Sequence, residues 1–113
     1  MTLSIDETEI EGLIRDIGMD DFKILLAAFL SECDSKLDSL ARNSKVADHA
    51  LLELDSHTLK SLSRTFGAVV LGEACAKLEN AAKNQDPKYY LPLFEEIKRA
   101  SLSATQALRD KYI

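Results

Sequence analysis

One stretch of apolar residues constrains the fold more than any other feature of this chain. A helix with 3.6 residues per turn brings positions three and four apart onto one face. The stretch therefore predicts a long amphipathic helix that buries this face against other helices, with Asp20 or Asp21 as its N-terminal cap. Its apolar positions follow that spacing throughout: Phe22, Leu25, Leu26, Phe29, Leu30, Cys33, Leu37 and Leu40.

Four further segments show the same helical spacing. The first runs from a capping Asp6 to Ile17, before Gly18, and the third runs from a capping Ser44 to Gly67. The fifth begins beside Pro92, with residues 88–91 as a lead-in turn. The apolar positions are Ile10, Leu13, Ile14 and Ile17 in the first, Leu71, Cys75, Leu78 and Ala82 in the fourth, and Phe94, Ile97, Ala104 and Leu108 in the fifth.

Long helices joined by short breaks pack antiparallel. The breaks in this chain are short and polar, as at residues 84–87. We therefore predict an all-α fold, an antiparallel four-helix bundle with a short N-terminal cover helix. At 113 residues, the chain is expected to form a single domain over residues 1–113.

Charge and hydropathy exclude several classes of protein. Nineteen acidic residues against fourteen basic ones give a net charge of -5, which disfavours binding to nucleic acid. A mean hydropathy of -0.11 is typical of a water-soluble protein without a membrane span. The first ten residues lack the basic and apolar regions of a signal peptide, and two cysteines are too few for a disulfide scaffold. We expect a cytoplasmic protein.

The third predicted helix carries the candidate chemistry. At 100° per residue, His57 lies opposite a core-facing side made of Leu52, Leu59, Leu62 and Phe66. An exposed imidazole with Lys60 and Arg64 beside it could carry a phosphoryl group, because nearby cations offset the charge of the phosphate. The spacing of His57 and Lys60 alone is also common on ordinary solvent-exposed helix faces. The imidazole's side of the helix also holds Leu54 and Ser61.

A longer run includes these residues: His57-Thr58-Leu59-Lys60-Ser61-Leu62-Ser63-Arg64-Thr65-Phe66-Gly67-Ala68. It resembles the signature of histidine-containing phosphotransfer (HPt) domains, with leucine at +2, lysine at +3, a small residue at +4, an apolar residue at +9 and glycine at +10. The family often has glycine at +4, where this chain has Ser61. The resemblance continues through Leu71, Cys75 and Leu78-Glu79, and through Ile17-Gly18, Phe29-Leu30 and Asp34-Ser35. Small stand-alone phosphorelay proteins of the LuxU type, from bacterial quorum sensing, are similar over nearly the whole chain.

The resemblance implies that His57 accepts a phosphoryl group from an aspartate of a receiver domain, as in a hybrid sensor kinase. It then passes the group to the receiver of a downstream response regulator. Attack by Nε2 requires the proton on Nδ1, and the family pattern assigns Glu79 to bond that nitrogen. Lys83 matches a basic position near the phosphate. The expected docking residues are Leu54, Ser61, Arg64 and Lys83.

The same resemblance implies a monomeric phosphocarrier rather than an enzyme. The chain has no Gly-rich phosphate loop and no nucleotide site, so we expect no cofactor of its own. Mg²⁺ would be supplied by the receiver. The alternative is a helical adaptor that docks receivers without being phosphorylated. An enzyme with a histidine nucleophile would need a base and a substrate-binding loop, which the sequence lacks.

The helical spacing also places four further polar or reactive residues. Asp55 projects toward the core, where the family pattern favours an apolar or small residue, so its charge must reach solvent or a partner. His49 lies about 80° from the face of His57 and is expected to be an ordinary surface residue, since a metal site of His49, His57 and a cysteine lacks suitable spacing. Cys33 and Cys75 lie on apolar stripes and are expected to be core thiols.

Overall fold

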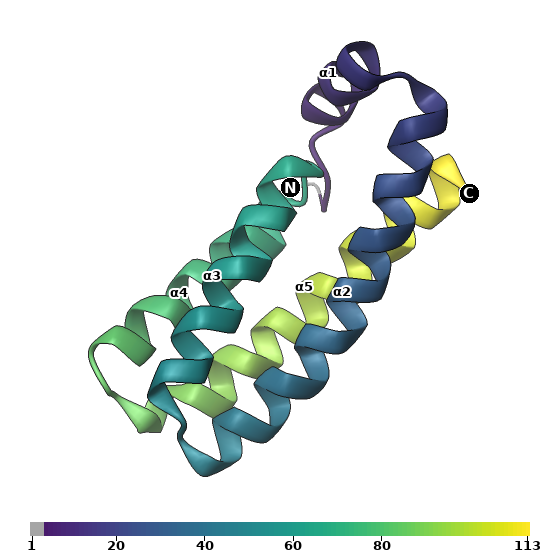
Figure 1. The fold of residues 1–113 in the computed structure, drawn as a ribbon. Coiled ribbons are helices and arrows are strands. Elements are labelled where there is room, and N and C mark those ends of the chain that lie inside the picture. The colour runs from purple at the N-terminus through teal and green to yellow at the C-terminus, as the bar shows by residue number, and fades with distance from the viewer. Residues whose placement is uncertain (1–3) are drawn as a thin grey trace.

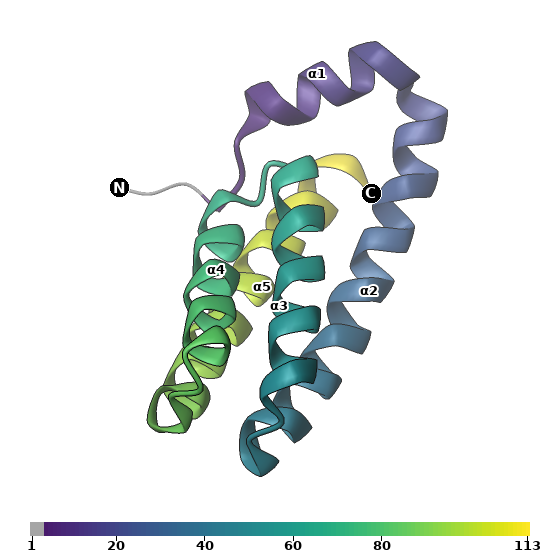
Figure 2. The same ribbon diagram turned by 60° about the vertical axis from the view of Figure 1, so that its left-hand side comes forward.

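The computed structural model describes residues 4–113, and over that range the chain is helical. Figures 1 and 2 show the long helices lying side by side, with the helix nearest the N-terminus crossing one end of them. The all-α prediction is confirmed. The elements are α1 (Glu7–Ile17), α2 (Met19–Val46), α3 (His49–Thr65), α4 (Val69–Lys83), the 3₁₀ helix η1 (Pro87–Tyr89) and α5 (Tyr90–Tyr112). None of these helices is long and apolar enough to cross a membrane.

A side chain caps the N-terminus of α1, whereas α2 begins at a glycine without a side-chain cap. Asp6 caps α1 as predicted, because its carboxylate accepts from the backbone N–H of Thr8 at 3.0 Å. Gly18, at φ +87°, ends α1 and begins α2. The prediction that Asp20 or Asp21 caps α2 is wrong: both lie inside its first turn, where negative charge favours the helix N-terminus.

The apolar face of α2 is buried along most of its predicted length. Leu37 is only partly buried, and Leu25 is 46% exposed. At 100° per residue, Leu25 lies about 60° to one side of Phe22 and Leu40. The buried positions, such as Leu26 and Leu30, spread to the other side of that line. The face that packs is therefore narrower than the sequence pattern indicates.

The turn between α2 and α3 corrects the predicted start of the third helix. Ser44 is not a cap, because α2 continues past it to Val46 and its side chain is buried. Ala47 then adopts a left-handed conformation, φ +54°, which ends α2. Asp48 caps α3 by accepting from the backbone N–H of Leu51 at 3.0 Å.

A strap formed by residues 4–6 joins the N-terminal end of the described chain to the turn between α3 and α4. The backbone N–H of Asp6 donates to the carbonyl oxygen of Gly67 at 2.6 Å, and Ile5 is buried beside it. Gly67 has φ +66°, and a Cβ there would lie 2.5 Å from the carbonyl oxygen of Asp6. The turn therefore requires glycine, and the strap holds α1 across the end of the other helices (Figure 2).

The last helix begins close to where the sequence places it. The lead-in turn is η1, and Pro92 lies in the first turn of α5, where a missing N–H costs nothing. His49 is not an ordinary surface residue, since its Nδ1 lies 2.6 Å from the hydroxyl of the fully buried Tyr90. This contact ties the start of α3 to the start of α5.

The two cysteines are buried free thiols in the core, as predicted. Burial raises the pKa of Cys33 to about 11 and that of Cys75 to about 12. Aromatic packing lies at the α1 end of the same core, where the rings of Phe29 and Phe66 stack with centroids 4.7 Å apart. The core is therefore continuous from the covered end to the middle of the long helices.

Candidate functional site

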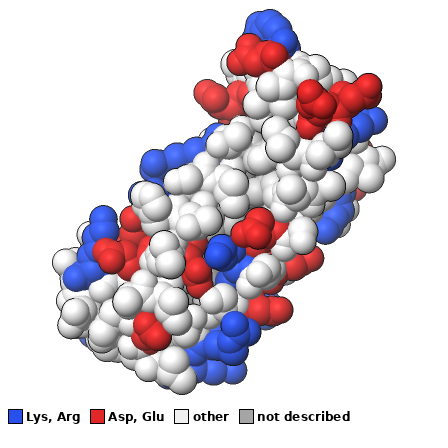
Figure 3. Space-filling view, in the orientation of Figure 1, with Lys and Arg blue, Asp and Glu red and all other residues white. Residues whose placement is uncertain are grey.

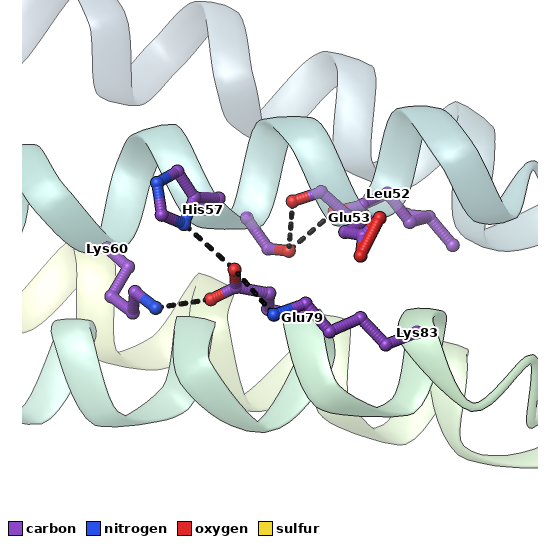
Figure 4. A network of polar contacts seen from close by, with 7 residues as sticks. Leu52, Glu53, His57, Lys60, Glu79 and Lys83 are labelled. Atoms are coloured by element: carbon purple, nitrogen blue, oxygen red, sulfur yellow. Dashed lines mark hydrogen bonds and ion pairs between the residues drawn. The ribbon is translucent and has the colours of Figure 1, made fainter.

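His57 lies near the middle of α3 and turns away from the core. Its side chain is 58% exposed, while Leu52 and Leu59 on the same helix are fully buried. The Nδ1 atom lies 2.8 Å from Oε2 of Glu79 on the neighbouring helix α4. Figure 4 shows the ring with this nitrogen toward Glu79 and its other nitrogen away from it. The outer nitrogen, Nε2, is the one that a partner can approach.

Glu79 is a buried carboxylate held among three basic side chains. The residue is 5% exposed. Its Oε1 accepts from Lys60 Nζ at 2.5 Å, and its Oε2 lies 3.7 Å from Lys83 Nζ as well as next to His57 (Figure 4). Burial by itself would raise the pKa of Glu79, but the hydrogen bonds from Lys60 and His57 outweigh it and lower the pKa below its usual value. The carboxylate is therefore ionised at neutral pH.

An ionised carboxylate fixes the tautomer of the histidine. It can only accept hydrogen bonds, so the proton of the neutral imidazole must lie on Nδ1. The lone pair then lies on Nε2, the exposed nitrogen. In this tautomer the site presents the Nε2 lone pair to solvent, with the negative charge of Glu79 directly behind the ring.

The other predicted site residues fall around this pair. The side chain of Lys60 is only 17% exposed, although the residue lies on the same side of α3 as His57. It is partly buried because it packs toward α4 and reaches Glu79. Leu54 and Ser61 are exposed on α3. Arg64 is exposed as well, and its stem packs near Gly72, where a Cβ would lie 3.5 Å from Arg64 Cγ. Lys83 is exposed on α4, one turn after Glu79.

Sequence reasoning did not find the partners of Asp55. The residue is buried on the side of α3 that faces α2, where it contacts Lys36 at 3.2 Å and accepts from Ser39 at 2.5 Å. The signal was present in the spacing of Lys36 and Ser39, which lie three residues apart at the edge of the apolar face of α2. Nothing in the sequence pairs that edge with α3 in particular.

The negative charge of the chain is concentrated away from His57. Residues 1–21 hold seven of the nineteen acidic residues and only Arg15 of the fourteen basic ones, which leaves twelve acidic against thirteen basic residues in the rest. Figure 3 shows acidic side chains gathered at the end of the molecule that α1 covers. Within residues 4–113, no three histidine, cysteine or carboxylate side chains cluster as metal ligands.

Comparisons with known proteins identify the family of this chain. Residues 24–110 match the family model described as "Hpt domain". The phosphorelay protein LuxU of Vibrio harveyi is 34% identical over 79 residues, which cover 70% of this chain and 69% of LuxU. LuxU of Vibrio vulnificus strain YJ016 is 33% identical over 82 residues, covering 73% of this chain and 71% of that protein.

The fold is also found in a solved structure. The crystal structure of histidine-containing phosphotransfer protein B (HptB) from Pseudomonas aeruginosa PAO1 superposes with a TM-score of 0.93. The match covers 99% of this chain and 96% of that one, at 22% sequence identity. At that identity the likeness concerns the helical fold.

Proposed function

Because this chain belongs to the Hpt domain family and has a histidine phosphotransfer role in a phosphorelay, we propose that His57 is its phosphorylated residue. The observation that carries the proposal is the 2.8 Å contact between His57 Nδ1 and the buried carboxylate of Glu79. The phosphoryl group would come from a receiver aspartate and pass to the receiver of a response regulator. The chain would act as a phosphocarrier and not as an enzyme.

The transfer forms one bond to phosphorus and breaks another. The lone pair of His57 Nε2 attacks phosphorus while the bond between phosphorus and the aspartyl oxygen breaks, and the aspartate leaves as a carboxylate. The Nδ1 proton stays in place, so the phosphorylated ring carries positive charge next to Glu79. The return step reverses these changes. Glu79 therefore stabilises the charge that develops on the ring in both directions.

Lys60 and Lys83 would have different roles in the transfer. Lys60 is largely buried and holds Oε1 of Glu79, so its role is to orient that carboxylate. Lys83 lies farther from Glu79, at 3.7 Å, and its exposed ammonium can turn toward a phosphoryl group on Nε2. We propose that Mg²⁺ comes with the receiver domain and that this chain holds no cofactor.

The helices would hold His57 and its neighbours in place for docking of a receiver domain. We propose that α2 to α5 act as an antiparallel four-helix bundle, with α1 as its cover, and present His57 on an open face. The docking surface would consist of Leu54, Ser61, Arg64 and Lys83. The partners would be the receiver of a hybrid sensor kinase and a response regulator, in a cytoplasmic quorum-sensing relay, with this chain as a monomer.

Transfer of label from a phosphorylated receiver tests the proposal. A receiver charged with a small phosphodonor should add one phosphoryl group to the wild-type chain, lost in acid and stable in base. His57→Gln should remain unlabelled. His49→Gln should be labelled at the normal rate, although it loses the contact with Tyr90. Acid-stable label, or label on His57→Gln, would refute the assignment, and receiver binding without any transfer would favour the adaptor.

A second experiment tests the docking surface. Ser61 lies one turn after His57 on an exposed face, so Ser61→Phe should block transfer from the receiver while the melting temperature stays near that of the wild type. Leu54→Ala should weaken receiver binding more than it lowers stability, because Leu54 is exposed. Normal transfer to Ser61→Phe would mean that the receiver approaches over another face.

A further inference from the structure

The carboxylate of Asp55 is buried but takes no part in the site around His57. The residue is 6% exposed and both of its oxygens are bonded to α2. Its Oδ1 lies 3.2 Å from Lys36 Nζ, and its Oδ2 accepts from Ser39 Oγ at 2.5 Å. Ser39 Oγ in turn accepts from Asn43 Nδ2 at 3.2 Å. One side chain of α3 is therefore fixed to two successive turns of α2 by directional bonds.

Asp55 and His57 lie on opposite sides of α3. Two residues advance a helix by 200°, so Asp55 faces α2 where His57 faces Glu79 on α4. Between them, Leu52 and Leu59 make apolar contacts in the core, and such contacts are not directional. The polar contacts on its two flanks therefore add directional restraints on the orientation of α3 about its own axis.

A small rotation of α3 would break the contact with Glu79. Side-chain atoms lie about 5–6 Å from a helix axis, so a rotation of about 10° moves them by about 1 Å. The distance from His57 Nδ1 to Glu79 Oε2 is 2.8 Å, and a hydrogen bond is lost near 3.6 Å. The same rotation would displace Asp55 Oδ2 from Ser39, so the bonds on the α2 side resist it.

We propose that Asp55 is a positioning residue for His57, which sets the rotation of α3 so that the imidazole meets Glu79. Burying an ion pair costs about as much in desolvation as the attraction returns, and the best-supported role of such pairs is to define register. This inference rests on the proposed function, because it gives Asp55 a role in orienting the imidazole that accepts the phosphoryl group.

The double variant Asp55→Leu/Lys36→Met tests this role. It removes both charges and leaves apolar side chains of similar size, so the melting temperature should stay the same or rise. The readout is the ¹⁵N NMR spectrum of the imidazole. In the wild type, Nδ1 should carry a slowly exchanging proton. In the variant we expect a mixture of tautomers, faster exchange, and transfer slower by about tenfold to a hundredfold.

A matched control removes an ion pair that does not touch α3. Lys77 and Glu96 pair at 2.7 Å between α4 and α5 on the surface, so Lys77→Met/Glu96→Leu should leave the imidazole spectrum and the transfer rate unchanged. A folded Asp55→Leu/Lys36→Met variant with the wild-type spectrum and rate would overturn the proposal. If that variant does not fold, Asp55→Ala gives the decisive spectrum, because Lys36 is already 23% exposed and can turn to water.

The spectrum also separates this inference from the proposed function. It requires no phosphorylation, so it reports the orientation of His57 even if no receiver transfers a phosphoryl group to the chain. Absence of transfer to the wild type would refute the proposed function alone. A wild-type spectrum in the folded Asp55 variant would refute the positioning role alone.

Discussion

Replacing Glu79 with alanine would remove the partner of three basic side chains at once. The contact that concerns the chemistry is the one to His57, at 2.8 Å. A hydrogen bond to a charged group contributes about 1.5–3 kcal/mol, and positive charge develops on this ring during transfer. If the whole contribution is made in the transition state, at about 1.4 kcal/mol per factor of ten, Glu79→Ala should slow transfer by about tenfold to 150-fold.

The fold should survive this change. Lys60 loses its partner, but its long side chain can extend toward water, so we expect the free energy of unfolding to fall by about 1–2 kcal/mol. Rapid-quench measurement of transfer from a phosphorylated receiver gives the rate, and circular dichroism gives the helicity. Glu96→Ala, which removes an exposed carboxylate paired with Lys77, is the control and should transfer normally. A normal rate for Glu79→Ala at unchanged helicity would refute the assigned role.

Three further predictions concern stability and reactivity. Burial works to raise the pKa of Glu79, but Lys60 and His57 lower it below its ordinary value of 4.5. The ionised carboxylate therefore stabilises the fold above pH 4.5. In urea titrations, the difference in unfolding free energy between wild type and Glu79→Ala should shrink as the pH falls from about 5 to 3. Gly67→Ala should lower the free energy of unfolding by about 2–4 kcal/mol, because the added Cβ is strained at a positive φ and overlaps the strap. Gly12→Ala, inside α1, should raise the free energy of unfolding by up to about 1 kcal/mol, because the atom nearest to its added Cβ is Arg15 Nη2 at 3.7 Å. Equal effects of the two variants in thermal melts would contradict this. The buried thiols of Cys33 and Cys75, with pKa values raised to about 11 and 12, should resist a thiol reagent at pH 8 and both react after denaturation.

The sequence is informative where a contact depends on the geometry of a single helix. Spacing alone places His57 opposite Leu59 and predicts most of the buried face of α2, with Leu25 as the exposed exception. It also places Asp6 before α1, where the cap forms. Each of these features depends on residues within a few positions of one another, so the helical repeat determines them.

Other features depend on how helices meet. Ser44 and Asp48 are both good capping residues, but Ser44 lies inside α2, which continues to Val46, so Asp48 caps α3. His49 bonds Tyr90, and Asp55 bonds Lys36, across helices whose relative rotation the repeat does not define. Periodicity places Glu79 at the border of the apolar face of α4, but its pairing with His57 in particular depends on the family resemblance.

The strap between Asp6 and Gly67 has a consequence for the order of folding. Its hydrogen bond joins residues about sixty positions apart, and it needs the left-handed turn at Gly67 as its acceptor. Neighbouring helices such as α3 and α4 can pair through contacts that are much closer in sequence, and local contacts form first. Docking of α1 therefore completes folding, and its backbone amides should exchange with deuterium before those of α3 and α4.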